Sequence, residues 1–252
     1  MCYHFQDHDT EDYIAWFVKE HNIKAYKWQG AKYYVNGYDH GKNYVITQEK
    51  PDEIQQYEWG LIASWVKDTA DAKIRQNQTL NAKSETVFEL ASFKGSIKTK
   101  KCLVFAKGFF EWRHINTKQK IPYIIGIRDL KDAKKFKPFT FGGIYNIWTD
   151  KSSGEVRETF SIITVPANEM MSVIHNSKQR MPLIIPEANQ WEWLTTPDEK
   201  RINELMVPFP SAAMMAHPVS KLVSQKVIST AKDCPEIIAA AEYEEVSSSE
   251  FL

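Results

Sequence analysis

Residues 101–113 read KCLVFAKGFFEWR, and this stretch decides the fold. Aromatic and β-branched residues are typical of strands, so the stretch predicts one strand at Lys101–Ala106 and a second at Phe109–Arg113. Runs of the same kind predict further strands at Pro122–Ile127, Thr140–Trp148 and Thr159–Val165. The middle of the chain is therefore expected to form a sheet.

The flanking sequence adds short strands and several helices. Upstream, a capped helix is expected from Thr10 to about Asn22, and a second from Ser84, as N-cap, to about Phe93. Similar patterns predict strands at Lys32–Val35, Asn43–Thr47, Gln56–Leu61 and Met181–Ile185, and helices at Ala167–Ile174, from Pro186 onward, and from Pro197 to Leu205. Strands outnumber helices and do not alternate regularly with them. This favours an α+β fold with a mainly antiparallel, barrel-like sheet and flanking helices.

Length and composition indicate one globular unit. The chain has 252 residues, of which 43% are hydrophobic, so it can bury a substantial core. We expect a single domain over residues 1–235 and an acidic, frayed tail over 236–252. The apolar runs are too short to cross a bilayer, and the polar start of the chain is unlike a secretory signal. Three scattered cysteines favour neither a disulfide framework nor a metal site, so we expect no cofactor and a cytoplasmic location.

Charge is distributed unevenly along the chain. The 32 Lys and Arg equal the 32 Asp and Glu in number, but six acids and no base follow residue 232. The first 232 residues therefore carry 32 bases against 26 acids, a net charge of +6. This excess is compatible with a polyanionic partner, although many soluble enzymes carry a similar one.

Cys2 has an unusual position for a nucleophile. Removal of Met1, which aminopeptidases perform before a small second residue, leaves a cysteine with both a free α-amine and a thiol. An α-amine has a pKa near 7.7–8.0, so a large share of it is uncharged at cellular pH. Such an aminothiol condenses with an aldehyde to a Schiff base and then closes to a thiazolidine. An incidental cysteine is the alternative interpretation.

Two further segments carry polar residues that can perform chemistry. Glu111 lies in an otherwise apolar strand, where burial raises the pKa of a carboxyl and suits it to proton transfer; pairing with Arg113 or a lysine is the plainer alternative. Asn81 and Lys83 precede the helix expected at Ser84, and a helix N-terminus suits an anion such as phosphate. Capping explains Asn81 equally well.

His175 closes the helix expected at Ala167–Ile174. A histidine at a helix C-terminus tends to stay protonated and can act as a general acid, but a simple capping interaction is the more frequent explanation. Arg180, just before the next strand, can contact a phosphate or pair with a surface acid.

Together these segments resemble the SRAP family, the SOS response-associated peptidases or abasic-site processing proteins. Seven ordered blocks between residue 1 and about residue 186 carry the resemblance: Met1-Cys2, Trp59–Ile62 with Trp65, Asn81–Thr86, Lys101–Val104, Gly108–Trp112, Phe141–Tyr145, and Ile162–Asn168 through His175 to Arg180-Met181-Pro182.

The resemblance implies covalent crosslinking to abasic sites in single-stranded DNA. Cys2 would attack the ring-opened deoxyribose aldehyde, and Asn81 would orient that cysteine. Glu111 would handle protons at the α-amine and assist reversal of the crosslink. His175 would help to open the sugar ring and promote Schiff-base formation. No metal, membrane or second subunit is implied, so we expect a monomer.

The resemblance also implies DNA contacts, although this sequence departs from the family at several of them. Lys83 stands where the family usually has arginine, His4 replaces another arginine, and the spacing from His175 to Arg180 is longer than usual. Trp59 and Trp112 can stack on bases, but core packing is at least as good an explanation of each.

Two rival functions remain open on the same sequence. In a thiol peptidase or autopeptidase, Cys2 attacks a peptide bond with Glu111 and His175 as partners, which additionally requires an oxyanion hole. In a noncovalent reader of single-stranded or modified DNA, Cys2 plays no part. Replacement of Cys2 separates the reader from the crosslinking protein.

Overall fold

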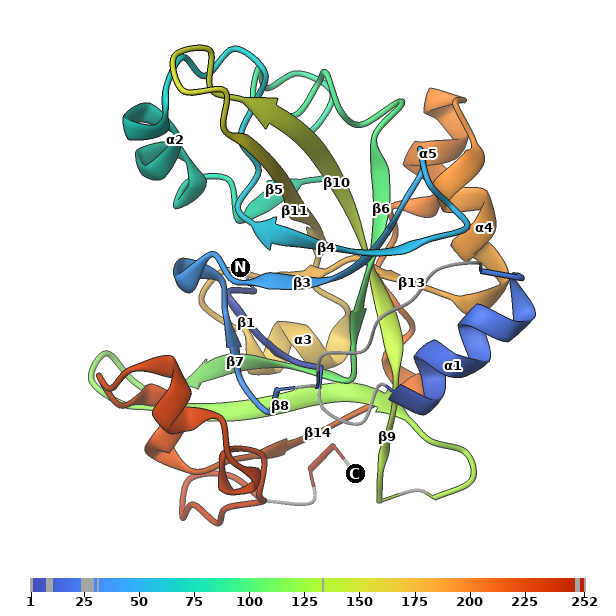
Figure 1. The fold of residues 1–252 in the computed structure, drawn as a ribbon. Helices are drawn as coiled ribbons and strands as arrows, with labels where there is room; N and C mark the ends of the chain where they lie inside the picture. The colour runs from blue at the N-terminus through green and yellow to red at the C-terminus, as the bar shows by residue number, and fades with distance from the viewer. Residues whose placement is uncertain are drawn as a thin grey trace.

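The computed structural model describes residues 2–7, 11–23, 30, 32–132, 134–247 and 250–251. Strands dominate it (Figure 1). Those placed near the sequence-predicted positions are β3 (Lys42–Thr47), β4 (Ile54–Trp59), β6 (Lys101–Ala106), β7 (Gly108–His114), β8 (Lys120–Arg128), β10 (Phe139–Thr149) and β11 (Val156–Pro166). The shorter strands are β1 (His4–Gln6), β2 (Val35–Asn36), β5 (Asn81–Lys83), β9 (Phe136–Lys137), β12 (Arg180–Pro182), β13 (Ile184–Ile185) and β14 (Met214–Pro218).

Two sheets make up the body of the molecule. One has the order β14-β8-β7-β1-β2, with β9 added to β8. The other has the order β12-β11-β4-β3-β6-β10-β13, with β5 added to β11. Because β10 also pairs with β11, the strands β11, β4, β3, β6 and β10 close into a five-stranded barrel. Only the pairings of β11 with β4 and β5 are parallel among those described, so the expected α+β, barrel-like fold is confirmed.

Helices pack against the barrel, and one of them packs between the two sheets. They are α1 (Glu11–Glu20), α2 (Thr69–Gln76), α3 (Glu169–Ile174), α4 (Glu187–Thr195) and α5 (Glu199–Leu205). In Figure 1, α1, α4 and α5 lie on one side of the molecule, while α3 lies between the sheets and contacts β7 and β12. The helix expected from Thr10 corresponds to α1; Thr10 itself lies outside the described residues.

Local sequence explains these helices. The first turn of α1 carries Glu11 and Asp12, which suit the positive end of a helix, and its Tyr13, Ile14 and Phe17 are buried. In α4, the buried Trp193 donates a hydrogen bond from Nε1 to the carbonyl of Cys102 on β6, at 3.0 Å. The helix is therefore anchored directly on the barrel.

The helix predicted from Ser84 to Phe93 is wrong. Residues 84–99 form successive turns, in which amides donate irregularly to carbonyls three or four positions back. Val87, Phe93 and Ile97 are buried and hold the turns against the core. These three side chains are buried without a regular helix. The sequence offered a favourable cap at Ser84, which by itself predicts a helix but does not determine one.

The acidic C-terminal segment, which the sequence predicts to fray, contacts the first sheet. Tyr243 donates from its hydroxyl to the carbonyl of Val219 at 2.6 Å, and Glu250 pairs with Arg113 on β7. The ring of Phe251 lies 6.2 Å from that of Tyr123 on β8. Among the described residues, no helix is both long and apolar enough to span a membrane.

Candidate active site

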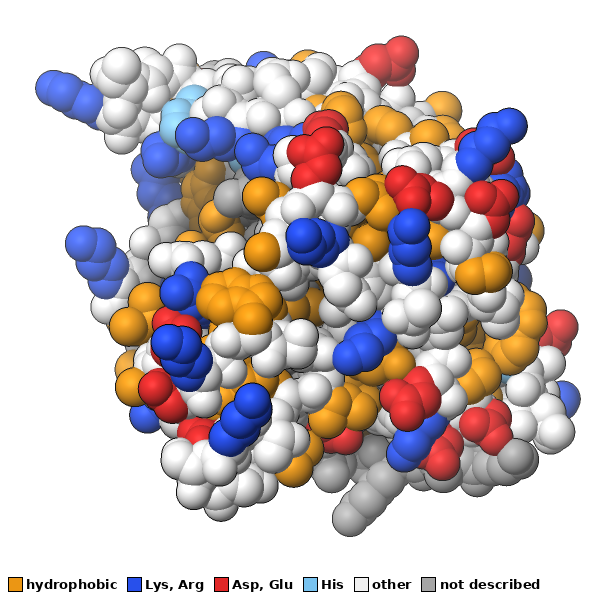
Figure 2. All heavy atoms as spheres, turned by 90° about the horizontal axis from the view of Figure 1, so that it is seen from above, with side chains coloured by type: hydrophobic (Ala, Val, Ile, Leu, Met, Phe, Trp, Pro, Cys, Tyr) orange, Lys and Arg blue, Asp and Glu red, His pale blue; other side chains and the backbone are white. Residues whose placement is uncertain are grey.

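A basic cleft of about 630 Å³ opens beside β7 and β8. Glu111 is the one acid among its described lining residues, whereas four lysines line it: Lys118, Lys120, Lys178 and Lys232. The remaining lining residues are Tyr3, His4, Tyr34, Trp112, His114, His175, Ser177, Val223 and Ser224. Seen from above the fold, Lys and Arg side chains gather with a histidine beside a hollow at one corner of the molecule (Figure 2). Such a lining attracts anions.

Glu111 and His175 face each other in this cleft. Glu111 projects from β7, and His175 is the C-cap of α3, which the buried Met170, Met171 and Ile174 anchor in the core. The His175 Nε2 and Glu111 Oε2 atoms are 3.6 Å apart, and the two side chains are only 6% and 5% exposed. Strand and helix thus bring together two residues that lie 64 positions apart in the sequence.

Burial sets the protonation of this pair. Desolvation raises the pKa of Glu111 to about 8 and lowers the pKa of His175 to about 4. At neutral pH the carboxyl is therefore mainly protonated and the imidazole is neutral. His175 Nδ1 lies 2.8 Å from the carbonyl oxygen of Arg180, to which it donates, so the lone pair of Nε2 faces the carboxyl. The pair can pass a proton without either member starting as an ion.

The expectation that His175 stays protonated at its helix end is wrong. A helix C-terminus favours the imidazolium, but α3 has only six residues and the ring is buried. Loss of water around the charged form outweighs the helix dipole, so the pKa falls instead of rising. The histidine is a proton acceptor at neutral pH.

Cys2 lies fully buried near Glu111. Burial raises the pKa of its thiol, and the nearby Glu111 raises it further, so the resting thiol is uncharged. Its Sγ lies 3.5 Å from the carbonyl of His4. Asn81 donates from Nδ2 to the carbonyl oxygen of Cys2 at 2.8 Å. That bond lets Asn81 orient the backbone of Cys2.

Asn81 and Lys83 are held by a strand and not by a helix end. They form β5, which pairs in parallel with β11 at Ile162–Thr164. Because no helix starts at Ser84, the anion site expected at its N-terminus is absent from this segment. Lys83 is nevertheless exposed at the end of β5, where a phosphate can reach it.

Arg180 and Trp112 lie at the edges of the site. The guanidinium of Arg180 pairs with Glu85 and donates to the carbonyl oxygen of Thr164, as the surface-acid interpretation expects. Trp112 lines the cleft and donates from Nε1 to the Ser224 hydroxyl at 2.7 Å. Of the two tryptophans proposed to contact bases, Trp112 is therefore the better placed.

Two members of the expected DNA-binding set need correction. Trp59 is 0% exposed, stacks on Phe160, and donates from Nε1 to Leu80, so it is a core residue that no base can reach. His4 stacks on Tyr34, and burial lowers its pKa to about 3. It lines the cleft as a neutral ring and cannot replace the charge of an arginine.

Sequence reasoning missed the lysines of the cleft. Lys118 lies in the turn between β7 and β8, Lys120 is the first residue of β8, and Lys178 lies in the loop that follows His175. The sequence signal was their closeness to Glu111 and His175 along the chain. Lysines are common on every surface, however, and only the pairing of β7 with β8 places Lys118 and Lys120 on the same hairpin as Glu111.

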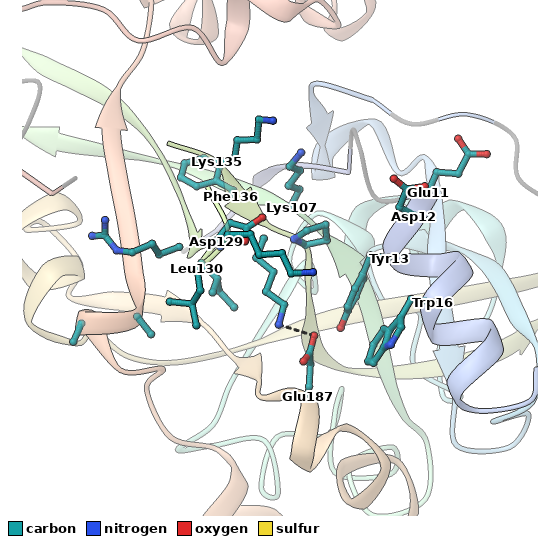
Figure 3. Close-up of a pocket in the computed structure, with 17 residues that line it drawn as sticks. Glu11, Asp12, Tyr13, Trp16, Lys107, Asp129, Leu130, Lys135, Phe136 and Glu187 are labelled. Carbon is teal, nitrogen blue, oxygen red and sulfur yellow. Dashed lines mark hydrogen bonds and ion pairs between the residues drawn. The ribbon is translucent and has the colours of Figure 1, made fainter. Parts of the chain in front are cut away.

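A larger cleft, of about 1150 Å³, lies elsewhere and contains none of the candidate residues (Figure 3). Its lining mixes charges, and Lys137 forms an ion pair across it with Glu187 at 2.9 Å. Tyr13 and Trp16 of α1 present stacked rings at one side. Within the described residues, no group of three or more His, Cys, Asp or Glu is arranged to hold a metal ion.

Comparison with known proteins connects this geometry to one family. Residues 1–226 match the model of the family described as SOS response associated peptidase (SRAP). The chain is similar to the abasic site processing protein YoqW of Bacillus subtilis, with 33% identity over 196 residues, 77% of this chain and 80% of that protein. It is also similar to the abasic site processing protein HMCES of Xenopus tropicalis, with 32% identity over 72% of this chain and 56% of that protein.

A solved structure agrees over almost the whole chain. The crystal structure of a Bacteroides thetaiotaomicron protein matches with a TM-score of 0.82 and 32% identity, covering 96% of this chain and 100% of the other. A Bordetella bronchiseptica protein matches with a TM-score of 0.70 at 18% identity, which supports the fold alone.

Proposed function

The chain belongs to the SRAP family, and from this membership we propose that it processes abasic sites in single-stranded DNA by capturing the sugar aldehyde covalently at Cys2. The observation that carries the proposal is the pair Glu111 and His175, which lines one basic cleft and lies beside the buried Cys2, whose thiol interacts electrostatically with Glu111. The relatives named for abasic-site processing support the same substrate.

The proposed chemistry proceeds in two steps, a condensation and an addition, once Met1 has been removed. The α-amine of Cys2 adds to the aldehyde carbon of the ring-opened deoxyribose, and the carbinolamine loses one water to give a Schiff base. The Cys2 thiol then adds to the same carbon, its proton passes to the nitrogen, and a thiazolidine closes. The net change is the loss of one water.

Glu111 and His175 supply the proton transfers. A protonated Glu111 can donate to the departing hydroxyl of the carbinolamine, and the neutral His175 can accept a proton from the sugar hydroxyl as the ring opens. Each group already holds the protonation state that its step requires at neutral pH. The lysines of the cleft would neutralise the flanking phosphates.

Intact-protein mass spectrometry tests the proposal. The protein is incubated with a uracil-containing single strand treated with uracil-DNA glycosylase, and the same spectrum reports whether Met1 is present. Wild type should gain the mass of the DNA less one water. Cys2→Ala should form no heat-stable adduct, because without the thiol its Schiff base hydrolyses, whereas Cys234→Ala, on a cysteine outside the cleft, should match wild type. A heat-stable adduct on Cys2→Ala, or none on processed wild type, contradicts the proposal.

A peptidase is the second candidate, because a thiol beside Glu111 and His175 also suits attack on a peptide bond. It predicts that Glu111→Gln retains Met1 when the chain is produced without methionine aminopeptidase. A noncovalent DNA reader, in contrast, predicts that Cys2→Ala binds the abasic strand with wild-type affinity and that no variant forms an adduct. The second outcome separates the reader from aldehyde capture, whereas self-removal of Met1 is compatible with aldehyde capture in the same protein.

A further inference from the structure

Asn176, the residue directly after His175, forms a double hydrogen bond with the strand that carries Glu111. Its Nδ2 donates to the carbonyl oxygen of His114 at 2.8 Å, and the amide of His114 donates to its Oδ1 at 3.0 Å. The backbone N–H and C=O of His114 are thus both bound by the side chain of Asn176. The arrangement copies the pair of bonds that a neighbouring strand would make.

The position on β7 explains why a side chain can bind there. On one edge β7 pairs with β8 as far as His114. On the other edge β1 pairs only at Gly108 and Phe109. At the far end of that second edge, Asn176 occupies the hydrogen-bonding groups that β1 does not reach.

The loop that contains Asn176 is itself rigidly closed. The carbonyl of His175 accepts from the amides of Lys178, at 3.2 Å, and Gln179, at 2.9 Å. Gln179, in the left-handed conformation with φ of 54°, donates from Nε2 to the carbonyl of Ser172 at 3.0 Å. The His175 ring is held from behind by the carbonyl of Arg180. Displacement of the loop relative to β7 would therefore move the imidazole.

We propose that Asn176 is a positioning residue that sets the separation of His175 from Glu111 by tying the loop after α3 to β7. The inference rests on the proposed function, in which this pair transfers protons. The two hydrogen bonds join Asn176, one residue from His175, to His114, three residues from Glu111. His175 Nε2 and Glu111 Oε2 are only 3.6 Å apart. Proton transfer falls steeply once the partners leave hydrogen-bonding reach, so a small displacement is costly.

Two variants and one control test the role of the hydrogen bonds between Asn176 and His114. Asn176→Ala removes both bonds, and Asn176→Asp keeps the size and the acceptor but loses the donor to His114. Asn203→Ala is the matched control, because Asn203 also donates from Nδ2 to a backbone carbonyl, that of Glu199, but on α5 outside the cleft. The probe is the glycosylase-treated single strand, and adduct formation is followed in a single turnover over a range of DNA concentrations.

Asn176→Ala and Asn176→Asp should each lower the rate at saturating DNA about tenfold. For Asn176→Ala, the DNA concentration at half the maximal rate should stay within about twofold of wild type, since Asn176 positions the pair and does not hold DNA. Asn203→Ala should match wild type in both quantities. A weaker affinity at an unchanged saturating rate would make Asn176 a DNA contact and would overturn the proposal.

Titration of His175 by NMR provides a readout that needs no DNA. Releasing the loop should give the ring more access to water and raise the pKa of His175 in Asn176→Ala by about one unit or more, with no change in Asn203→Ala. If Asn176→Ala matches wild type in both this pKa and the adduct rate, Asn176 does not position His175. If processed wild type forms no adduct, the proposed function fails, and the titration alone decides the role of Asn176.

Discussion

Glu111 and His175 show how burial controls single residues in this protein. Burial disfavours the charged form of each, which raises the pKa of the acid and lowers the pKa of the base. The sequence indicated the first shift, because Glu111 lies in an apolar strand. The second shift runs against the helix-end argument and depends on how deeply the ring is covered.

These shifts predict a characteristic loss of stability with rising pH. Between pH 6.5 and 8 an unfolded chain carries Glu111 ionised, whereas the folded chain keeps it protonated, so stability falls as pH rises. His175 is neutral in both states across most of this window and adds little. The free energy of unfolding should fall by about 2 kcal/mol.

Urea unfolding at pH 6.5 and pH 8 measures this loss. Glu111→Gln should abolish most of the decline and be more stable than wild type at pH 8, because a neutral amide replaces a carboxyl that resists ionisation. Glu89→Gln, on an exposed side chain, should keep the wild-type decline. An equal decline in Glu111→Gln would show that other groups cause it.

The same carboxyl predicts a bell-shaped pH profile for adduct formation. The rate should rise with pH as the α-amine loses its proton, around 7.7–8.0, and fall as Glu111 loses the proton that it donates, at about 8. Glu111→Gln should be slower, and its profile should lack the descending limb. Single-turnover rates between pH 6 and 9 check this, and a falling limb that survives in Glu111→Gln would remove Glu111 from the donor role.

At the scale of elements, the β7–β8 hairpin contributes most to the cleft, and β5 holds Asn81 against Cys2. The hairpin carries Glu111 on one strand and brings Lys118 and Lys120 to the rim. β5 uses its parallel pairing with β11 to bring Asn81 to Cys2. The hairpin and β5 thus each hold candidate residues on paired strands.

The hairpin lysines should contribute to DNA affinity through phosphate neutralisation. Each phosphate contact releases bound cations, so the double variant Lys118→Gln/Lys120→Gln should lower the slope of log affinity against log salt by about 0.7 per lysine for a single strand. Fluorescence anisotropy with a labelled strand between 50 and 200 mM salt measures this slope. Over that range, the loss of two contacts should change the ratio of wild-type to variant affinity by about one decade. Lys73→Gln/Lys94→Gln, on exposed lysines outside the cleft, should leave the slope unchanged. Equal slopes in the two double variants would exclude the hairpin as a phosphate contact.

At the scale of the whole molecule, barrel closure depends on close approach of β10 to its two neighbours. Gly143 pairs with Ile162 on β11 and with Cys102 on β6. A Cβ at this position would lie 2.8 Å from the carbonyl oxygen of Ser161 and 3.0 Å from the sulfur of Cys102. The barrel therefore tolerates no side chain here without moving backbone.

Gly143→Ala should destabilise the protein by about 1–3 kcal/mol, since the added methyl group meets backbone in a packed interior. Gly95→Ala is the matched control, because a Cβ there meets no atom within 4 Å, and it should change stability by less than about 0.5 kcal/mol. Thermal or urea unfolding of wild type, Gly143→Ala and Gly95→Ala measures these changes in stability. Gly143→Ala with wild-type stability would show that the strands can separate without cost.

The sequence by itself determined the strands of the barrel and the family, and it is the source of the chemistry proposed for Cys2. Alternation of side chains, strand propensity and ordered motifs are local properties, so they can be read along the chain. Local signals failed where long-range packing decides. The favourable cap at Ser84 starts no helix, because buried Val87 and Phe93 hold that segment in turns.

Only the tertiary structure decided which candidate residues meet and in what protonation state. It placed Trp59 in the core, joined Glu111 to His175, and brought lysines to the cleft through strand pairing. It also tied Asn176 to β7, a contact that no spacing in the sequence indicates. The physical reason is common to all of these: burial and the local dielectric environment depend on every segment packed around a residue, and most of those segments are distant in sequence.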